Sequence, residues 1–528
     1  RGAVQIPDPF LKRVLQVANA AVLRLLRERG VPAGCKDLGA GGLGCATSEL
    51  AAAGGRGAEI ELDRVHRVER PLAPEALLCA ETQERYCWVV PESFVPELLA
   101  VYNERFDLGG VHPGAGASLV GRALDDGRYR VLWHGEPVVD CPVEAITAAR
   151  RSPRLARRRP PEPRARRPER EKRPRAALLG LLSSPALGSR EYLYRHYDTE
   201  VQGRTWLRPG EGDAAVLRAH EERPTGLAFA VGGNPHWCAS DPELGARHAV
   251  AEATRNVACV GARPWALTDC LNFGRPEDPA VMGDLEATLE GLAVAARALG
   301  GLAARGSPLP FVSGNVSLYN QTGGRAVPPS PIVLCAGVLR DAAAAVGLAA
   351  LRPGDFLVLV GEPRDELGGS AYLREILRQP AGGPPDLDLE REARLQELAV
   401  AAGEGRWVAA AHDVSDGGLA VAAAEMLLAS PVERGLGLDL DLAVLETDSA
   451  LALFSERPGI VFEVSPGRAS RLFQAARERA LLAWPIGAVS AHGRLRLRLG
   501  RETAEWTRAE LARAAERPLA GLWNEELA

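Results

Sequence analysis

The sequence predicts an α/β (α+β) protein that contains an internal duplication, and two observations support this prediction. First, the 528 residues are 46% apolar and 25% charged, which is enough for roughly two to four ordinary domains with buried cores. Second, two segments far apart in the chain share a glycine-rich motif, and helical and strand periodicities surround it in the same order. The fold class therefore follows from a repeated unit.

The repeated motif reads KDLGAGGL from Lys36 and HDVSDGGL from His412. A glutamate follows the motif's aspartate by 12 residues in both copies. A second glutamate lies in a loop between two expected strands, 44 residues after the aspartate in the first copy and 43 in the second. Chance is a poor explanation for two matched spacings. We therefore expect the copies to superpose with Asp37 on Asp413 and Glu81 on Glu456.

The other elements follow from hydrophobic periodicity, in chain order. Helices are expected before the two motifs, at residues 10–29 and 389–402, and strands after them, at 58–62 and 436–442. The region between the copies adds a strand at 214–218, a helix at 250–257 and a strand at 266–274. A last strand is expected within 309–319, running into a turn at Gly314-Asn315.

These elements predict five segments. They are a C-terminal-type domain of a first half (1–149), an Arg/Pro-rich linker (150–190), an N-terminal-type domain of a second half (191–345), its C-terminal-type domain (346–500) and a tail (501–528). About 150 residues before the second motif have no counterpart before the first. We therefore expect that the first half lacks its N-terminal-type domain and that the sequence is a fragment of a longer duplicated protein. A natural three-domain protein is the alternative.

The linker has an unusual charge. Residues 150–175 hold 13 basic residues, three acidic residues and six prolines, so the net charge of −5 conceals a balance of −15 elsewhere. Such a segment cannot bury enough apolar surface to offset roughly 1–2 kcal/mol of backbone ordering per residue. We expect it to be extended and disordered, without contact to Asp37 or Asn315. A nucleic-acid arm is the alternative, but no aromatic residue is interleaved for stacking.

Composition argues against several classes of protein. No apolar run reaches the roughly 18 residues that cross a bilayer, so no membrane segment is expected. The nine cysteines are scattered without a CxxC pair, which indicates neither a disulfide framework nor a zinc site. A reducing cytoplasm is the expected location. Because the sequence outside the linker is acidic, no nucleic-acid partner is expected.

Oxygen-bearing side chains lie at expected strand ends, turns and helix faces, several of them beside glycine. They are Asp37, Asp213, Glu252, Asn256, Asp269, Asn315 and Asp413. Mg²⁺ that bridges substrate phosphates requires oxygen ligands of this kind. Each alone has a plainer interpretation, as a turn, a helix cap, a hairpin or an exposed helix face. No Walker A, Rossmann, HExxH or GxSxG motif is present, so a bound nucleotide would use a non-standard phosphate site.

The ordered motifs resemble those of a known family. VQIPDPF, KDLGAGGL, AETQER, PGEGDAAVLR, AEATRN, TDCLNFG, SGNVSLYN, ELGGSAY, HDVSDGG and LFSERPG are similar to motifs of phosphoribosylformylglycinamidine synthase, in its small-type synthetase subunit. The resemblance covers the chain apart from the linker and roughly the last thirty residues. It implies a member of the aminoimidazole ribonucleotide synthetase-like superfamily, with two halves of two α/β domains each and the N-terminal domains paired in a central β-barrel.

The resemblance implies an ATP-dependent ligase of purine biosynthesis. ATP would phosphorylate the amide oxygen of formylglycinamide ribonucleotide, and ammonia would displace the phosphate to give formylglycinamidine ribonucleotide. The ammonia would come from glutamine through a separate glutaminase subunit, helped by a small bridging subunit. The family's catalytic histidine and two acidic metal ligands are expected in the missing domain. No catalytic residue is therefore assigned here, and the chain alone is expected to be inactive.

The resemblance also implies roles for individual residues. The positions that match contacts to the ribonucleotide substrate are Gln5, Glu81, Thr82, Gln83 and Ser317. Thr82 stands where serine is more common and keeps the hydroxyl. Asp37 and Asn315 match Mg²⁺ ligands, and Asp269 and Gly314 match ATP contacts. We expect the first-half residues to face the second-half residues across one cleft.

A second set resembles the ligands of a non-catalytic nucleotide site, related to the active site by the internal pseudo-twofold: Asp213, Glu252, Asn256 and Asp413. A satisfied polar cluster at a domain interface is the alternative. Two further functions stay open. One is another ATP-dependent member of the superfamily, against which the fused duplication counts. The other is a non-catalytic nucleotide-binding fragment.

Overall fold

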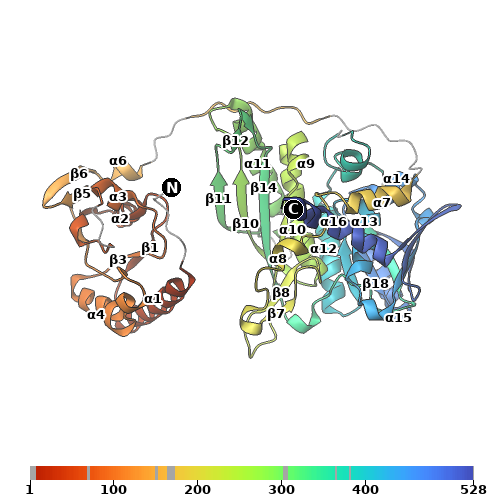
Figure 1. Ribbon diagram of the computed structural model, residues 1–528, viewed down its shortest axis with the longest axis horizontal. Helices are drawn as coiled ribbons and strands as arrows, with labels where there is room; N and C mark the ends of the chain where they lie inside the picture. The colour runs from red at the N-terminus through yellow and green to blue at the C-terminus, as the bar shows by residue number, and fades with distance from the viewer. Residues whose placement is uncertain are drawn as a thin grey trace. The chain divides into compact units, whose positions relative to one another are not determined.

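The computed structural model describes residues 8–67, 72–148, 153–162, 173–300, 307–362, 365–379 and 382–526. The chain forms two compact units, residues 1–153 and 154–528, and each unit is described by itself (Figure 1). The boundary between them falls inside the segment predicted to be the linker. Among the described residues, no helix is long and apolar enough to cross a membrane.

Unit 1 contains two small sheets. In the first, β1 (Gly34–Asp37) pairs with β3 (Tyr86–Val89) in antiparallel orientation. The second has the order β4-β2-β5-β6, with bounds Gly121–Leu124, Gly57–Glu61, Arg128–Trp133 and Glu136–Pro142. The helices are α1 (Pro9–Arg29), α2 (Gly42–Ala53), α3 (Pro74–Cys79), α4 (Val95–Ala100), α5 (Leu108–Val111) and α6 (Glu144–Thr147).

Helix α1 confirms the helix expected at residues 10–29, and its ends have local causes. The carboxylate of Asp8 accepts a hydrogen bond from the amide of Leu11 at 2.9 Å and so caps the first turn. Gly30 ends the helix with φ of 63°, a conformation that favours glycine. One face of α1 packs with α4 in the first core of unit 1, and α2, β2 and β5 form a second core.

Unit 2 begins with a six-stranded sheet of order β11-β10-β14-β9-β8-β7. The strands span Phe311–Ser317, Arg263–Asn272, Ser330–Leu339, Gly226–Gly232, Ala215–Arg218 and Thr205–Leu207. Helices α10 (Pro242–Cys259) and α11 (Pro279–Ala298) share a hydrophobic core with this sheet. Smaller elements are α8 (Glu191–Tyr194), α9 (Pro235–Ser240) and the hairpin of β12 (Gln321–Thr322) and β13 (Arg325–Ala326).

A seven-stranded sheet follows, with the order β16-β18-β15-β19-β17-β20-β21. The strands span Ala410–Asp413, Gly459–Val464, Phe356–Gly361, Leu482–Ser490, Gly437–Asp441, Arg494–Leu499 and Glu502–Thr507. Two hydrophobic cores pack against it. One involves α12 (Leu389–Glu404) and α15 (Pro466–Glu478); the other involves α7 (Pro174–Leu182), α13 (Gly418–Ala429), α14 (Ser449–Phe454) and α16 (Arg508–Glu526).

The two C-terminal-type domains share their strand pairings. Antiparallel β1-β3, antiparallel β2-β4, parallel β2-β5 and antiparallel β5-β6 in unit 1 correspond to β16-β18, β17-β19, β17-β20 and β20-β21 in unit 2. The structure thus agrees with the duplication inferred from the motif spacings. The difference is β15, which joins the two groups of strands in unit 2 and has no counterpart among the described residues of unit 1.

The expected linker is only partly as predicted. Residues 153–162 have no helix or strand, as expected for an extended chain, but they are ordered along α11. Arg154 pairs with Glu277 at 2.7 Å, Arg158 with Glu290 at 2.6 Å, and the amide of Arg157 donates to the carbonyl of Pro279 at 2.7 Å. The prediction that these residues are disordered is wrong, because acidic residues within α11 and just before it pair with the arginines. The remainder of 150–172 lies outside the described residues.

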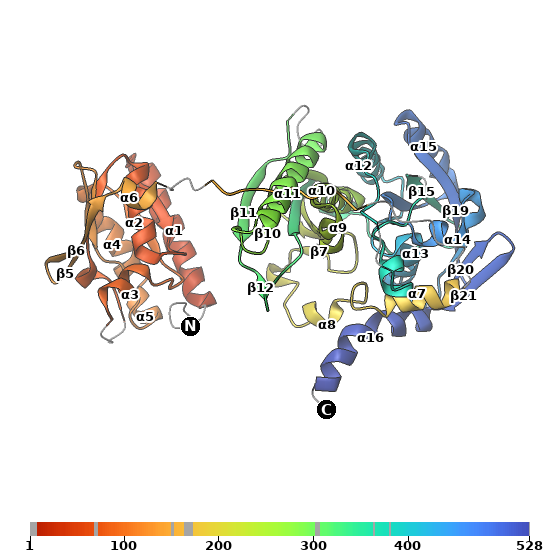
Figure 2. The ribbon, with the colours of Figure 1, turned by 90° about the horizontal axis from the view of Figure 1, so that it is seen from above.

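Both ends of unit 2 extend the seven-stranded domain beyond the expected limits of 346–500. Helix α7 falls inside the expected linker, yet its Leu178 and Leu181 are fully buried in the domain core. The expected tail forms β21 and α16, and β21 adds an antiparallel strand beside β20. Figure 2 shows α10 between the six-stranded sheet and α12, where it joins the two domains of unit 2.

Candidate functional site

The first glycine-rich motif forms a tight loop between β1 and α2. Asp37 is the last residue of β1, and its side chain is exposed. Gly41 and Gly42 follow with φ of 73° and 57°, a region in which side chains are strained. A Cβ on Gly42 would lie 2.3 Å from the carbonyl oxygen of Ala80. The glycines therefore let the loop approach the segment that carries Glu81.

The loop at 80–85 holds the expected substrate-binding residues beside this motif. Oε1 of Glu81 accepts a hydrogen bond from the amide of Gly41 at 3.3 Å. The guanidinium of Arg85 donates to the carbonyl of Thr82 at 2.9 Å and to that of Ala80 at 2.6 Å, which fixes the loop from within. The structure thus brings Asp37, Glu81, Thr82 and Gln83 into one region of unit 1. Gln5 lies outside the described residues.

The second motif has the same backbone but different surroundings. Oε1 of Glu456 accepts hydrogen bonds from the amides of Gly417 at 2.7 Å and Ala371 at 2.8 Å. Burial, reinforced by Asp416, raises the pKa of Glu456 well above its usual range. Asp413 is 4% exposed, whereas its counterpart Asp37 is open to solvent.

Helix α10 supplies the cation that compensates the buried acids. Nη1 of Arg255 lies 2.9 Å from Glu392 of α12, and its Nε lies 3.4 Å from Asp413. Burial raises the pKa of Asp413 to about 6, and Asp213 adds to the shift while Arg255 opposes it. Glu252, one turn before Arg255, accepts a hydrogen bond from the amide of Gly233 at 3.2 Å. Burial, with Asp416 and Asp413 nearby, raises the pKa of Glu252 to about 8.

Asp213, His412 and Asp413 form a compact cluster that could hold a metal ion, because their ligand atoms all lie within 4.8 Å of one another. Nδ1 of His412 lies 2.6 Å from Asp213, and its Nε2 lies 3.0 Å from Glu425. Burial would lower the pKa of His412, but Asp213 and Glu425 outweigh it and raise that pKa well above the usual value. The second carboxylate oxygen of Asp213 accepts the amide of Asp413 at 2.8 Å.

The structure therefore brings together three of the four residues expected at the second nucleotide site: Asp213, Glu252 and Asp413. Asn256 lies on the same helix as Glu252, and its Oδ1 is buried without a hydrogen-bond partner among the described residues. Sequence reasoning missed His412 and Arg255. The repeat held a signal for His412, because a basic residue precedes the aspartate in both copies of the motif. Lys36, which occupies the position of His412, also pairs with the glutamate at the end of its motif, Glu49, at 2.5 Å.

The remaining expected ATP and metal contacts lie on β10 and β11. These parallel strands pair Asp269 with Gly314, Cys270 with Asn315, and Asn272 with Ser317. Paired residues share a face and neighbours alternate. Asp269 and Gly314 therefore point to one face, while Asn315 and Ser317 point to the other.

Two details of this strand pair bear on its chemistry. A Cβ on Gly314 would lie 2.7 Å from Oδ1 of Asp269, so glycine leaves room for that carboxylate. The amide nitrogen of the Asn315 side chain donates to Sγ of Cys270 at 3.8 Å. The turn expected at Gly314-Asn315 is wrong, because pairing with β10 keeps both residues in an exposed edge strand.

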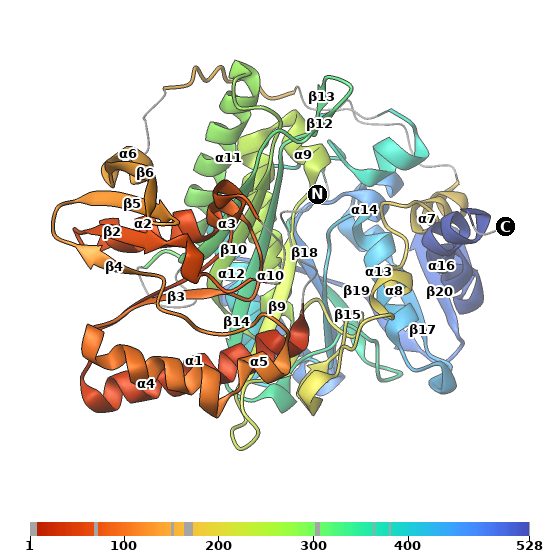
Figure 3. The same ribbon diagram turned by 60° about the vertical axis from the view of Figure 1, so that its left-hand side comes forward.

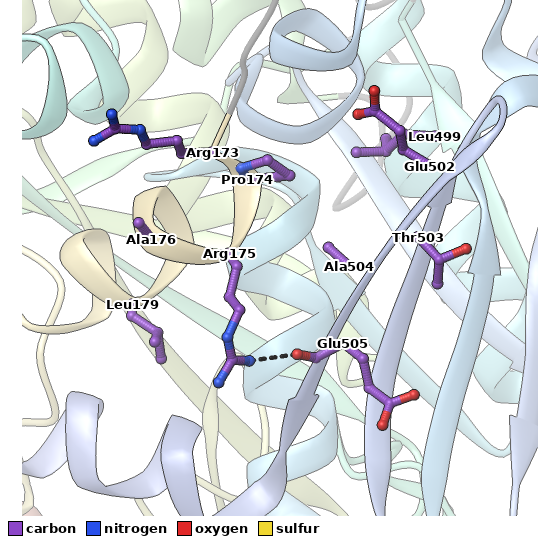
Figure 4. Close-up of a pocket in the computed structure, with 10 residues that line it drawn as sticks. All are labelled: Arg173, Pro174, Arg175, Ala176, Leu179, Leu499, Glu502, Thr503, Ala504 and Glu505. Carbon is purple, nitrogen blue, oxygen red and sulfur yellow. Dashed lines mark hydrogen bonds between the residues drawn. The ribbon is translucent and has the colours of Figure 1, made fainter.

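A surface pocket of about 610 Å³ lies elsewhere, between α7 and the β20-β21 hairpin (Figure 4). Arg175 crosses it and donates to the backbone carbonyl of Glu505, as the dashed line in Figure 4 shows. None of the residues expected at a site lines this pocket. Arg175, which lines the pocket, is already hydrogen-bonded within the chain. The oxygen-bearing residues at the strand ends are therefore the stronger candidates for a functional site.

Family models match both kinds of domain. The model for the C-terminal domain of AIR synthase related proteins matches residues 1–134 and again 352–500. The model for the N-terminal domain of the same proteins matches residues 211–339. The doubled C-terminal match agrees with the repeated strand pairings.

Similar proteins with assigned names show which family the chain belongs to. A phosphoribosylformylglycinamidine synthase subunit PurL from Thermus thermophilus is 39% identical over 525 residues, which are 98% of this chain and 68% of that protein. The chain belongs to the PurL family. The subunit PurL of Methanothrix thermoacetophila is 44% identical over 494 residues. The match covers 93% of the chain and 63% of that PurL, so the chain spans less than two thirds of this relative.

Solved PurL structures share the fold. Thermotoga maritima PurL complexed with FGAR superposes with a TM-score of 0.64 at 25% identity, covering 92% of this chain and 66% of that one. T. maritima PurL complexed with ATP gives 0.63 at 25% identity, covering 93% and 68%. The PurL fold thus extends over both units, which confirms the α/β class and the AIR synthase-related architecture predicted from the motifs.

Proposed function

We propose that this chain belongs to a synthetase that uses ATP and ammonia to convert formylglycinamide ribonucleotide into formylglycinamidine ribonucleotide. Its membership of the PurL family and its similarity to PurL structures complexed with ATP and with FGAR support the proposal. In this reaction ATP transfers a phosphoryl group to the amide oxygen, and ammonia then displaces the phosphate. Positioning and charge neutralisation do most of the work in such a transfer.

The difference between Asp37 and Asp413 is the observation that carries the proposal. The two residues end equivalent strands before equivalent glycine turns. Asp413 is buried and compensated by Arg255, whereas Asp37 is exposed. Only the first copy therefore offers its carboxylate to a ligand from solvent. This asymmetry suits one open catalytic loop and one closed structural loop.

Each expected residue has a proposed role that suits its setting. Asp37 and Asn315 would hold Mg²⁺; Asn315 donates through its amide nitrogen to Cys270, which leaves Oδ1 as the atom for a cation. Bound Mg²⁺ would neutralise charge on the transferred phosphoryl group. Asp269 and Gly314 would contact ATP. The proposed contacts to the ribonucleotide substrate are Gln5, Glu81, Thr82, Gln83 and Ser317.

Partner subunits are also proposed. A solved T. maritima complex is named PurLQS, and its matching chain superposes on this one with a TM-score of 0.63 at 26% identity. That similarity supports assembly with a glutaminase subunit that releases ammonia and with a small bridging subunit. The nine cysteines are all free, which supports a cytoplasmic location for the assembly.

The test is a chimera in which this chain replaces the matching 68% of the T. thermophilus relative. The chimera should convert formylglycinamide ribonucleotide with ATP, Mg²⁺ and ammonia. Asp37→Ala should lower kcat/KM by about 100-fold or more, because a catalytic metal contributes several kcal/mol. Asp125→Asn alters an exposed turn carboxylate of the same unit and should leave the rate unchanged. Full activity after Asp37→Ala would contradict the assignment.

A second nucleotide site at the buried cluster is supported by a separate observation. Oδ1 of Asn256 is buried without a hydrogen-bond partner among the described residues, and Asn256 lies one turn after Glu252, a cluster acid, on α10. Mg²⁺ with ADP should raise the unfolding temperature of the chain, and Asn256→Ala should remove most of that rise. Gln474→Ala, which changes an exposed residue of α15, is the control. An unchanged rise in Asn256→Ala would contradict a role for Asn256 in a nucleotide site.

A further inference from the structure

Strand β11 ends in a tight turn at residues 317–320, and this turn is tied to the end of β10. The amide of Tyr319 donates to the carbonyl of Gly274 at 3.0 Å. The amide of Asn320 donates to the carbonyl of Phe273 at 3.1 Å. These bonds join the ends of the two motifs TDCLNFG and SGNVSLYN, which explains physically why both motifs continue past their strands.

The side chain of Asn320 folds back onto Ser317. Its Nδ2 lies 2.9 Å from the carbonyl oxygen of Ser317 and 3.0 Å from the Oγ of the same residue. The carbonyl oxygen of Phe273 lies 3.3 Å from the same nitrogen. Carbonyl oxygens can only accept hydrogen bonds, so the nitrogen of this amide, and not its oxygen, must face them. The orientation of the Asn320 amide is therefore fixed by its surroundings.

This orientation determines how the hydroxyl of Ser317 can bond. An N–H of Asn320 occupies one lone pair of the hydroxyl oxygen, so the hydroxyl proton must point to another atom. In the described part of the chain its acceptor is Oδ1 of Asn320, at the longer distance of 3.3 Å. A ligand oxygen at the usual distance of about 2.7–2.8 Å would take the proton in preference. The hydroxyl is thus prepared to donate to a ligand.

Tyr319 holds the turn in a backbone conformation that a bulky residue rarely adopts. Its φ is 61°, in the left-handed region. Such strain persists only where surrounding contacts hold it, and it concentrates at functional sites. The side chain is 57% exposed, so packing covers little of it. Its hydroxyl instead donates to Oε1 of Glu277 at 2.8 Å, which anchors the strained residue.

The ordered part of the linker completes this anchor. Nη1 of Arg154 donates to the same Oε1 of Glu277 at 2.7 Å. The hydrogen bonds from Arg154 and, second, from Tyr319 lower the pKa of Glu277 to about 2, so this carboxylate is ionised at neutral pH. The surface of α11 accommodates the linker, because a Cβ on Gly283 would lie 2.3 Å from the carbonyl oxygen of Arg157. Figure 3 shows the linker trace passing over one end of α11.

We propose that Asn320 is a positioning residue that directs the proton of the Ser317 hydroxyl to an acceptor oxygen of the substrate. Arg154 supports the same turn through Glu277 and Tyr319, so the linker helps to shape the site. The inference rests on the contact of Ser317 with formylglycinamide ribonucleotide that is proposed above. It adds a chemical requirement to that contact: the substrate atom at Ser317 accepts a hydrogen bond.

The first test is a double-mutant cycle in the chimera described above. Asn320→Ala and Ser317→Ala should each raise KM for formylglycinamide ribonucleotide by about tenfold and leave kcat within about twofold. The double variant should be no worse than Ser317→Ala alone, because Asn320 acts through that hydroxyl. Gln321→Ala, which changes the exposed neighbour of Asn320, is the control and should leave KM unchanged.

The outcomes separate the inference from the function on which it rests. Effects that multiply in the double variant, or a normal KM in Asn320→Ala beside a raised KM in Ser317→Ala, would overturn the inference. Asn320→Asp keeps the shape but cannot donate at neutral pH, so a normal KM in that variant would overturn it as well. A normal KM in Ser317→Ala would contradict the substrate contact, and with it the inference, while the test of the metal ligand Asp37 would stand.

The second test concerns the linker and uses the full chain without substrate. Arg154→Gln and Tyr319→Phe should each speed hydrogen exchange of the amides of residues 319 and 320 by about threefold or more. Arg158→Gln, which removes a linker ion pair farther along α11, should leave these amides unchanged. Unchanged exchange in Arg154→Gln, or an equal acceleration in Arg158→Gln, would overturn the role of Arg154 in holding the turn.

Discussion

Glu81 accepts a hydrogen bond from the amide of Gly41 at 3.3 Å, although the two residues are 40 positions apart. Glu456 and Gly417 repeat the bond at 2.7 Å in the second half. The bond ties the loop that precedes β3 in the first copy, or β18 in the second, to the turn at the start of the helix α2 or α13. It explains physically why the two spacings of 44 and 43 residues are kept.

The first prediction concerns Gly42, the residue after the hydrogen-bond donor Gly41. Gly42→Ala should destabilise the motif by about 2 kcal/mol or more, because a Cβ would lie 2.3 Å from the carbonyl oxygen of Ala80 at φ of 57°. Hydrogen exchange of α2 measures the opening free energy. Gly39→Ala is the control from the same loop, since no heavy atom lies within 4 Å of its Cβ position. Equal protection of α2 in both variants would refute this account of the turn.

The second prediction concerns the buried cation of α10. Arg255→Met should destabilise unit 2 by about 3–5 kcal/mol, because Glu392 and Asp413 would be left without their buried partner. Arg263→Met removes an exposed pair with Glu404 and should cost about 1 kcal/mol or less. Urea unfolding measures both. Similar losses in the two variants would show that the buried cluster does not depend on Arg255.

The third prediction concerns residues 153–162, which run along α11. Their ion pairs are partly exposed, as in Arg158 with Glu290 at 41% and 52% exposure, so salt should screen them. Trypsin cleavage after Arg154 and Arg158 should accelerate as NaCl rises to about 1 M. Glu290→Gln should accelerate cleavage at low salt, and Glu478→Gln, far along the chain on α15, should not. A cleavage rate that does not change with salt concentration would mean that backbone hydrogen bonds, and not ion pairs, hold the segment on the protein.

Much of the fold could be predicted because helix caps, glycine turns and hydrophobic periodicity are local features of the sequence and recur in both copies of the repeat. Asp8 and Gly30 mark the ends of α1, and the glycine pair marks the start of α2. The turn expected at Gly314-Asn315 was wrong for the opposite reason. Parallel pairing with β10, from residues some 45 positions earlier, overrides the local turn preference.

Part of the candidate site also has a local signal. Motif spacing marks Asp37 and Asp413, and Glu81 and Glu456, as equivalent positions, while the roles proposed for Asp37, Glu81 and Asp413 come from the family resemblance. Arg255 and Glu392 pair although they are 137 positions apart, and hydrophobic periodicity does not predict such a contact. The order of residues 153–162 depends on acids of α11 more than 120 positions later. Composition describes such a segment alone and carries no information about its partner.

The last prediction is a pH dependence at Glu463 of β18, which is fully buried. Its two carboxylate oxygens accept the amides of Leu351 and Arg352, each at 2.8 Å. Burial nevertheless raises its pKa to about 7 from the model-compound value of 4.5.

The sign follows from linkage. A carboxyl with a raised folded-state pKa binds its proton more tightly in the folded protein. Its contribution is therefore fully present below pH 4.5 and is lost as pH rises through about 7.

The matched variant isolates this contribution. Glu463→Gln removes the titration while keeping the shape, and its amide group imposes a constant cost opposite a backbone donor. Relative to that variant, the wild-type free energy of unfolding should fall by up to about 3 kcal/mol between pH 4.5 and 7. Urea unfolding at several pH values measures the difference, and other titrating groups such as His248 cancel in it. Glu478→Gln, an exposed carboxyl, should give a flat difference. A flat difference for Glu463→Gln as well would show that the two amide bonds fully offset burial.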